Sequence, residues 1–179
     1  MKKIFFAIAA VAALASCSKS EVEYAQTNEI TFTPVAKNIT KAMMEGTTFT
    51  TSEEFNVWAF YNPTTELAAD IDAWVAEYLA AGADAQIYLD DKTFAYDGSY
   101  SLWAGKANAY FWPKVGSLAF AGYHPSSVTA AYVLEGDKNQ MTFSDVLNSW
   151  VSADAANTED LMYFNLTKGF VKNNVTAVF

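Results

Sequence analysis

The sequence predicts a mainly-β fold, an antiparallel β-sandwich with one helical insertion. Short segments that alternate apolar and polar residues recur at roughly even spacing between turn residues, as sandwich strands do. Aromatic residues make up 16% of the 179-residue chain, which supplies large side chains for packing between sheets. Helical periodicity is clear in one long segment, residues 66–81, which interrupts the strand series.

The first 16 residues are typical of a secretion signal. Lys2 and Lys3 precede an apolar run that is shorter than the roughly 20 residues needed to span a bilayer. The string Leu-Ala-Ser-Cys that ends at Cys17 resembles a lipobox, in which the cysteine is acylated and the signal is cleaved before it. The alternative is an ordinary signal peptide with a chance cysteine. We expect Cys17 to carry the lipid.

The charge of the chain excludes several partners. The net charge is −9 and there is no arginine, so the protein has little means of neutralising phosphates, and we expect no nucleic-acid partner. The same charge disfavours adsorption to anionic lipid, so the acyl chains must provide the anchor. With its one cysteine acylated the chain has no disulfide, and the core must hold the fold.

A polar tether, residues 17–28, is expected before one domain, residues 29–179. The domain begins with an alternating strand at residues 30–35. Residues 55–61 are apolar on both faces, which is typical of a central strand. Further strands are expected at residues 86–89, 93–96, 108–112, 118–123, 128–134, 140–143, 161–166 and 174–179.

The helix at residues 66–81 is expected to begin at Thr64 or Thr65 and to end at Gly82. Because it interrupts the strands, we place it in a crossover that packs on one sheet. A second short helix is expected at residues 145–151.

The most distinctive string runs from residue 110 to residue 125. We interpret it as an aromatic hairpin: a strand that ends at Pro113, a turn through Gly116, and a return strand that ends at Pro125. Prolines mark the strand ends because they cannot donate to a ladder. We expect this hairpin to form part of the core.

Together with three other strings, the hairpin resembles the fimbrillin family of Bacteroidetes, which consists of pilins and minor fimbrial proteins, usually lipoproteins. The other strings are residues 38–42 (NITKA), 55–61 (FNVWAFY) and 159–163 (EDLMY). The resemblance implies a transthyretin-like sandwich, an outer-membrane or fimbrial location and a role in cell adhesion. The implied partners are other fimbrial subunits, and host or bacterial surface ligands for an adhesin.

In polymerising members of the family, a protease removes the first strand and the next subunit donates a strand to the vacated groove. The resemblance therefore implies that the strand containing Ile30, Phe32 and Val35 is a displaceable edge strand. The bond between Lys41 and Ala42 lies where the family often has a basic residue before alanine, so it is the expected processing site.

The chain departs from the family pattern in two ways. It has no arginine, so an arginine-specific protease is excluded as its processing enzyme. The family's second domain is expected to be absent or truncated, because the sequence given stops at Phe179 within a predicted strand.

No catalytic residue, metal ligand set or cofactor is expected. His124 is the one histidine, and without a second ligand or nucleophile we interpret it as a residue at a solvated corner. The carboxylate pairs Glu53/Glu54 and Asp90/Asp91 are adjacent in sequence, so on a strand each pair points to opposite faces. We do not expect a calcium site at Asp90, Asp91 and Asp97, because these residues lack the regular spacing of oxygen ligands in an EF-hand loop. We therefore expect a non-enzyme.

The alternative function is that of a surface glycan-binding lipoprotein. Its site would be an exposed stacking platform formed by aromatic rings. Core packing is the competing interpretation of the same rings. The residues are Tyr100, Trp103, Tyr110 and Trp112.

Overall fold

The computed structural model describes residues 28–35, 49–64, 68, 70–135, 138–144, 161–166, 169–170 and 175–179, and it confirms a mainly-β fold. The first strands are β1 (Phe32–Val35), β2 (Phe55–Asn62), β3 (Gln86–Asp97) and β4 (Leu102–Gly105). They are followed by β5 (Ser117–His124), β6 (Thr129–Glu135) and β7 (Lys138–Ser144). The last are β8 (Met162–Phe164), β9 (Gly169–Phe170) and β10 (Val175–Val178).

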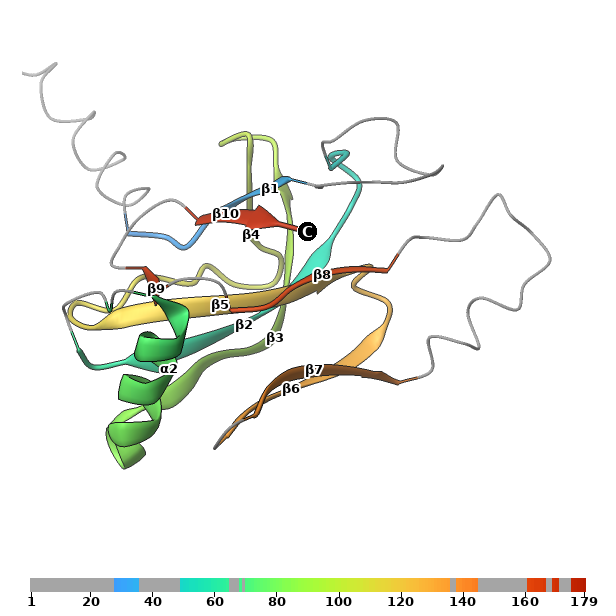
Figure 1. The fold of residues 1–179 in the computed structure, drawn as a ribbon. Coiled ribbons are helices and arrows are strands. Elements are labelled where there is room, and N and C mark those ends of the chain that lie inside the picture. The colour runs from blue at the N-terminus through green and yellow to red at the C-terminus, as the bar shows by residue number, and fades with distance from the viewer. Residues whose placement is uncertain are drawn as a thin grey trace, which may run out of the picture.

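The main sheet has eight strands in the order β10-β1-β4-β3-β2-β5-β8, with β9 also paired to β5 (Figure 1). The β1–β10 pair is parallel, and the other strand pairs of this sheet are antiparallel. Strands β6 and β7 form a separate two-stranded sheet. Within the main sheet the longest uninterrupted pairing joins β2 to β5, and both of these strands are buried on both faces.

The main sheet folds over on itself, which gives the sandwich-like core. Phe32 on β1 contacts Phe55 on β2 and Phe120 on β5, although β1 and β2 are separated in the sheet by two strands. Figure 1 shows β10, β1 and β4 as a layer that faces β2 and β5. The rings of Phe164 and Phe179 lie 5.0 Å apart, so the β8 and β10 edges approach each other. One face of the sheet thus encloses the larger core cluster.

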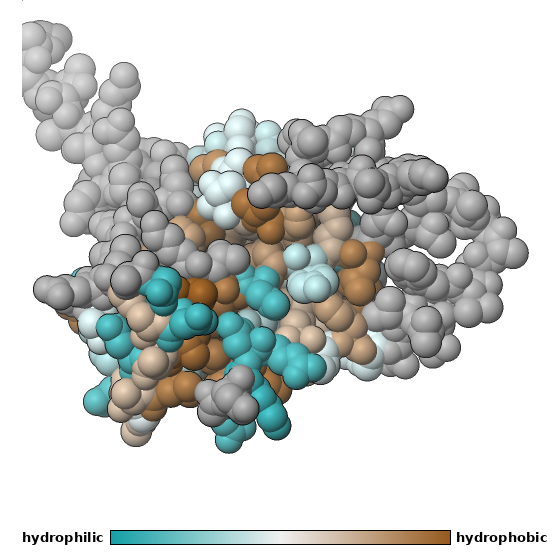
Figure 2. Space-filling model, in the orientation of Figure 1, coloured by the Kyte–Doolittle hydropathy of each residue, from teal (hydrophilic) through white to brown (hydrophobic). Residues whose placement is uncertain are grey.

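Helix α2 (Ile71–Ala80) and the β6–β7 hairpin cover the opposite face of the sheet (Figure 1). Trp74 of the helix is buried and donates from Nε1 to the hydroxyl of Ser117 at 2.9 Å. Trp58 and Phe60 on β2 contact Tyr132 of the hairpin. In Figure 2 hydrophobic surface lies between the helix and the hairpin, bordered by hydrophilic atoms.

The predicted helix exists, but its start and its topological role differ from the prediction. It begins after Asp70, whose carboxylate accepts from the Ala73 amide at 2.9 Å, and not at Thr64 or Thr65. Gly82 follows its end with φ +58°, as predicted for a residue that ends a helix. The strands that it joins, β2 and β3, are antiparallel neighbours, so the helix is an insertion and not a crossover.

The two strands expected at residues 86–89 and 93–96 form one long strand, β3. A β-bulge interrupts its pairing with β2, because Val57 pairs with Lys92 while Ala59 pairs with Leu89. Asp91 lies in this bulge with φ +49°. The break expected between two strands at Asp90 and Asp91 is therefore a bulge within one strand.

The aromatic hairpin expected at residues 110–125 is not formed. Its second half is β5, but the residues before it pair with the start of the domain: the Ile30 amide donates to the Tyr110 carbonyl at 2.7 Å. Trp112 is buried in the core, whereas Phe111 is 49% exposed. Strands β4 and β9 were not expected. The expected helix at residues 145–151, residues 17–27 of the tether with Cys17, and the bond between Lys41 and Ala42 lie outside the described residues.

Candidate functional site

The predicted displaceable strand occupies a slot between two other strands. β1 pairs with β10 over four positions, from Phe32 opposite Val175 to Val35 opposite Val178. On its other side it pairs with β4 at one position, Phe32 opposite Trp103. The expectation of an edge strand was therefore wrong. The described edges of the sheet are β10 on one side, where it adds to β1 from outside, and β8 and β9 on the other, where both pair with β5.

Every second residue of this segment points into the core. Ile30, Phe32 and Pro34 are fully buried, and the Thr33 side chain between them is exposed. Val35 lies on the other face and is half-buried. The inward set is thus Ile30, Phe32 and Pro34, with the period of two that a strand requires.

Phe32 is at the centre of the aromatic core. Its ring meets those of Phe55, Phe94 and Phe120 edge to face, at centroid distances of 5.7, 4.8 and 5.3 Å. Each of these partners comes from a different strand: β2, β3 and β5. Removing Phe32 would therefore leave a cavity bordered by three strands, and burial of such a ring contributes about 3–5 kcal/mol when judged by truncation to alanine.

Backbone hydrogen bonds hold both ends of the segment. At its start, the Trp112 amide donates to the Asn28 carbonyl at 2.8 Å, next to an isolated bridge between Glu29 and Phe111. At its end, the Phe179 amide donates to the Val35 carbonyl at 2.9 Å. The segment is therefore bound through main-chain contacts that do not depend on its side chains.

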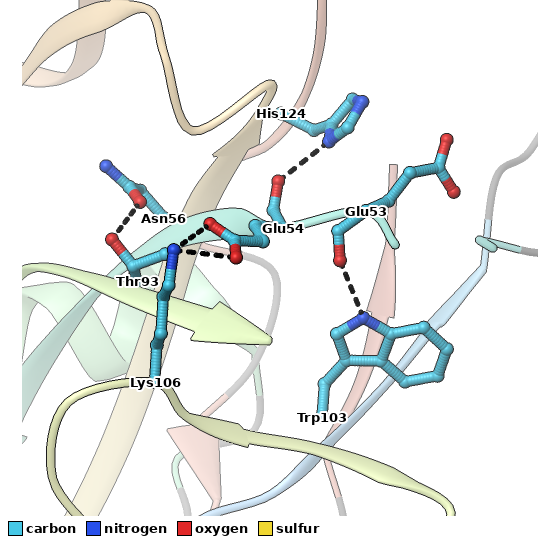
Figure 3. Close-up of polar contacts among 7 residues, drawn as sticks. All are labelled: Glu53, Glu54, Asn56, Thr93, Trp103, Lys106 and His124. Carbon is cyan, nitrogen blue, oxygen red and sulfur yellow. Dashed lines mark hydrogen bonds and ion pairs between the residues drawn. The ribbon is translucent and has the colours of Figure 1, made fainter. Parts of the chain in front are cut away.

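β4, which forms one wall of the slot, is held in place by contacts of the Trp103 side chain. Trp103, which pairs with Phe32, donates from Nε1 to the Glu53 carbonyl at 3.2 Å (Figure 3). Its ring also meets Tyr96 edge to face at 5.0 Å. The indole thus joins β4 to the residues directly before β2.

The residues before β2 carry further polar contacts. Glu54 forms an ion pair with Lys106, with Nζ–O distances of 2.7 and 2.8 Å (Figure 3). Nδ1 of His124 lies 2.9 Å from the Glu54 carbonyl, and because a carbonyl only accepts, this nitrogen is the donor. His124 is the last residue of β5 and is 5% exposed, packed edge to face on Phe49. Its placement at a solvated corner was wrong, since it belongs to the core boundary.

Asn56 links three strands through a buried network. Its amide nitrogen donates to the Tyr123 hydroxyl at 2.8 Å and to the Asp91 carboxylate at 3.1 Å. Its amide oxygen accepts from the Thr93 hydroxyl at 2.9 Å (Figure 3). The Tyr123 hydroxyl donates to Asp91 at 3.0 Å or to the Val128 carbonyl at 3.0 Å. Burial raises the pKa of Tyr123 to about 12, so this phenol stays neutral and remains a donor.

Four of the acidic residues singled out in the sequence have structural contacts, and Asp90 is exposed. Glu53 accepts from the Thr50 amide, Glu54 pairs with Lys106, and Asp91 holds the β3 bulge. Asp97 accepts from the Ser99 amide in the turn between β3 and β4. Glu29 has a raised pKa, first because burial disfavours its charge and second because Asp97 repels it. Among the described residues, no three His, Cys, Asp or Glu side chains are grouped to hold a metal ion.

The aromatic platform required by the alternative, glycan-binding function is not formed. Trp103 and Trp112 are buried at 6% and 9% exposure, and Trp112 packs edge to face on Phe120. Tyr110 is half-buried against Phe94. Tyr100 is exposed, but one ring makes no platform. Core packing accounts for three of the four aromatic residues, Trp103, Tyr110 and Trp112.

Several contributors to the slot were not singled out in the sequence. Pro34 takes the third inward position, and Val175 and Ala177 of β10 form the second wall. Alternation of Val175, Ala177 and Phe179 signalled a half-buried strand, but no local pattern indicates that this strand pairs parallel with the first one of the domain. Proline before the last residue of β1 indicated a strand end, not a pocket.

The comparisons with known proteins concern the start of the chain. Residues 1–18 match the family model described as a prokaryotic membrane lipoprotein lipid attachment site. Cys17 is the one cysteine in the chain and lies within the match, so the protein is a lipoprotein held to a membrane by its lipid. No curated protein sequence and no solved structure matches the chain. Within the described residues, no helix has the length and apolarity that a membrane span requires.

Proposed function

We propose that this lipoprotein is a fimbrial subunit or fimbria-associated adhesin at the cell outer membrane, and that it joins other subunits by strand replacement at the β1 slot. The observation that carries this proposal is the insertion of Ile30, Phe32 and Pro34, from one short strand, into the centre of the core. The resemblance to fimbrillins supplies the biological setting.

The geometry of β1 supports replacement by another polypeptide. The strand is four residues long, and its register with β4 consists of one pair. An incoming strand would run parallel to β10 and fill the Phe32 site with an apolar side chain. Main-chain hydrogen bonds provide affinity in such strand addition, while the alternate side chains provide specificity.

Processing between Lys41 and Ala42 would have two consequences at once. Both Cys17 and β1 precede this bond in the sequence, and β2 to β10 follow it. One cleavage would therefore release the remainder from its lipid anchor and allow β1 to leave the slot. An empty slot exposes the Phe32 site to water, which favours capture of a strand from a neighbouring subunit.

Exchange of a labelled peptide tests the proposal. A specific protease site replaces Lys41 and Ala42, the chain is cut there, and a fluorescent peptide of residues 28–36 is added in excess. We expect the fluorescence anisotropy of the peptide to rise as it displaces the resident strand. A Phe32→Asp peptide should bind at least about 100-fold more weakly, because it would bury an unpaired carboxylate.

A matched control is a Thr33→Asp peptide, whose altered side chain would be exposed and whose binding should stay within a few-fold of the native peptide. The cut protein must keep its circular dichroism spectrum throughout. If the native and Phe32→Asp peptides bind equally, or neither enters the folded cut protein, strand replacement at this slot is refuted.

A further inference from the structure

Exposed apolar side chains gather at one end of the molecule. Among the described large hydrophobic residues with high exposure are Val115 at 61%, Ile87 at 53% and Phe111 at 49%. Val115 lies just before β5, and Ile87 near the start of β3, at the end where β2 finishes. Most other residues of this kind lie on other elements, such as Tyr163 on β8 and Val178 on β10.

Two half-buried tyrosines, Tyr88 and Tyr61, lie between Phe111 and Gly116, the residue next to Val115. The Tyr88 hydroxyl donates to the Phe111 carbonyl at 2.6 Å, and the Tyr88 ring lies 6.4 Å from that of Tyr61. The Tyr61 ring in turn packs on Gly116, where an added Cβ would lie 2.5 Å from its Cε2 atom. We name Tyr61, Tyr88, Phe111 and Val115 the apolar rim. The exposed side chain of Lys114 stands beside it in sequence.

The lipid-bearing segment enters the fold at this rim. The Asn28 carbonyl accepts from the Trp112 amide, and Glu29 bridges to Phe111. Figure 1 shows the start of β1 and the start of β5 at the same end of the molecule. Eleven residue steps separate Cys17 from Asn28, so the entry point is within roughly 40 Å of the acylated residue at full extension.

We propose that the apolar rim rests on the phospholipid surface in which the lipid of Cys17 is inserted. The Tyr61 ring suits this boundary because its body is apolar and its hydroxyl can reach the wet headgroups, while the Tyr88 hydroxyl holds the backbone at Phe111. Lys114 can extend its ammonium group to the phosphates while its stem stays apolar. The tether makes this contact intramolecular, so a small area suffices for occupancy.

This orientation has a consequence for the opposite end. Tyr163 pairs with Tyr123, and Tyr123 pairs with Asn56 at the start of β2, whereas the rim adjoins the end of β2. With the rim on the membrane, Tyr163 and the end of β1 at Val35 face away from it. The inference depends on the lipid anchor and is independent of strand replacement.

Depth-dependent quenching tests the orientation. The acylated protein is reconstituted in vesicles of phosphatidylethanolamine with a minor share of phosphatidylglycerol, and only protein that floats with the vesicles is measured. Because the Cys17 thiol is acylated, a Val115→Cys variant offers one free thiol for an environment-sensitive fluorophore. We expect nitroxide-labelled lipid to quench this probe at least about two-fold more than a probe at Tyr163→Cys, which is 53% exposed in the native protein.

A second variant separates the rim from the anchor. Adding Phe111→Asp and Lys114→Glu to the Val115→Cys protein should reduce the quenching to the level of the Tyr163→Cys probe while flotation is unchanged. Equal quenching at positions 115 and 163 in the parent protein would overturn the proposal, as would quenching at 115 that survives both charge changes.

Discussion

At the scale of residues, Tyr123 shows how a buried polar group can hold three elements together. Its hydroxyl lies within hydrogen-bond distance of Asn56 on β2, Asp91 in the β3 bulge and the Val128 carbonyl before β6. Asp91 has the left-handed backbone that a bulge of this kind favours, and its carboxylate lies within hydrogen-bond distance of both the Tyr123 hydroxyl and the Asn56 amide nitrogen. The phenol therefore fixes an irregularity in the backbone as well as a packing position.

Alkaline pH should destabilise the protein through this group. The folded-state pKa of Tyr123 is about 12, above its ordinary value of 10.0, so its contribution is complete below pH 10 and is lost as pH rises through 12. Tyr123→Phe should lower the unfolding free energy at neutral pH by about 1 kcal/mol. It should also reduce the alkaline loss, of which Tyr132 keeps a share because burial raises its pKa to about 12 as well. Urea unfolding at neutral and alkaline pH measures both. An alkaline loss equal in the variant and the native protein would contradict this assignment, and Tyr163→Phe, with its exposed ring, is the control.

At the scale of elements, α2 and β1 depend on different interactions. The helix is ten residues long, too short to be stable alone, and it is retained by Trp74 against β5 and by its cap at Asp70. β1 is shorter still, and it is retained by the aromatic partners of Phe32 and by pairing with β10. Local sequence thus favours the helix, while distant strands determine β1.

The cap of α2 gives a direct prediction. Asp70→Ala removes the acceptor for the Ala73 amide and should reduce the unfolding free energy by about 1 kcal/mol. Asp70→Asn keeps a capping oxygen and should lose less than half of that. Denaturant unfolding compares the two variants, and equal losses would mean that the carboxylate acts through its charge and not through the cap.

At the scale of the whole molecule, one segment of chain both connects the domain to its lipid anchor and supplies β1. Asn28 and Glu29 contact the residues around Phe111, and Phe32 follows immediately in the slot. Any force or cleavage that acts on the tether therefore acts close to the strand that closes the core. Anchoring and core closure are coupled by sequence proximity.

The anchor itself is tested by one substitution. Cys17→Ser removes the thiol that takes the acyl chain, so metabolic labelling with palmitate should disappear and the protein should leave the membrane fraction. Ser20→Ala, which lies beyond the matched residues 1–18, is the matched control and should stay lipidated. Continued membrane association of Cys17→Ser would assign the anchor to another part of the chain.

Local sequence determined much of the secondary structure. Alternation located β1, β6 and β7, apolar runs located β2 and β5, and helical periodicity with Gly82 located α2 and its end. These features are predictable because side-chain period and turn chemistry are properties of neighbouring residues. The signal that ends at Cys17 is also predictable from local sequence, because it is a linear motif of neighbouring residues.

Long-range pairing was decided only in the tertiary structure. The sequence contained no indication that β10 would add parallel to β1 and convert an expected edge strand into an interior one. Nor did it indicate that Tyr110 would pair with Ile30, or that Phe111 would stay exposed next to the buried Trp112. Alternation in a strand indicates that one of its faces is buried. It does not indicate which strand pairs with it or which element covers that face, because both depend on how the whole sheet folds over its core.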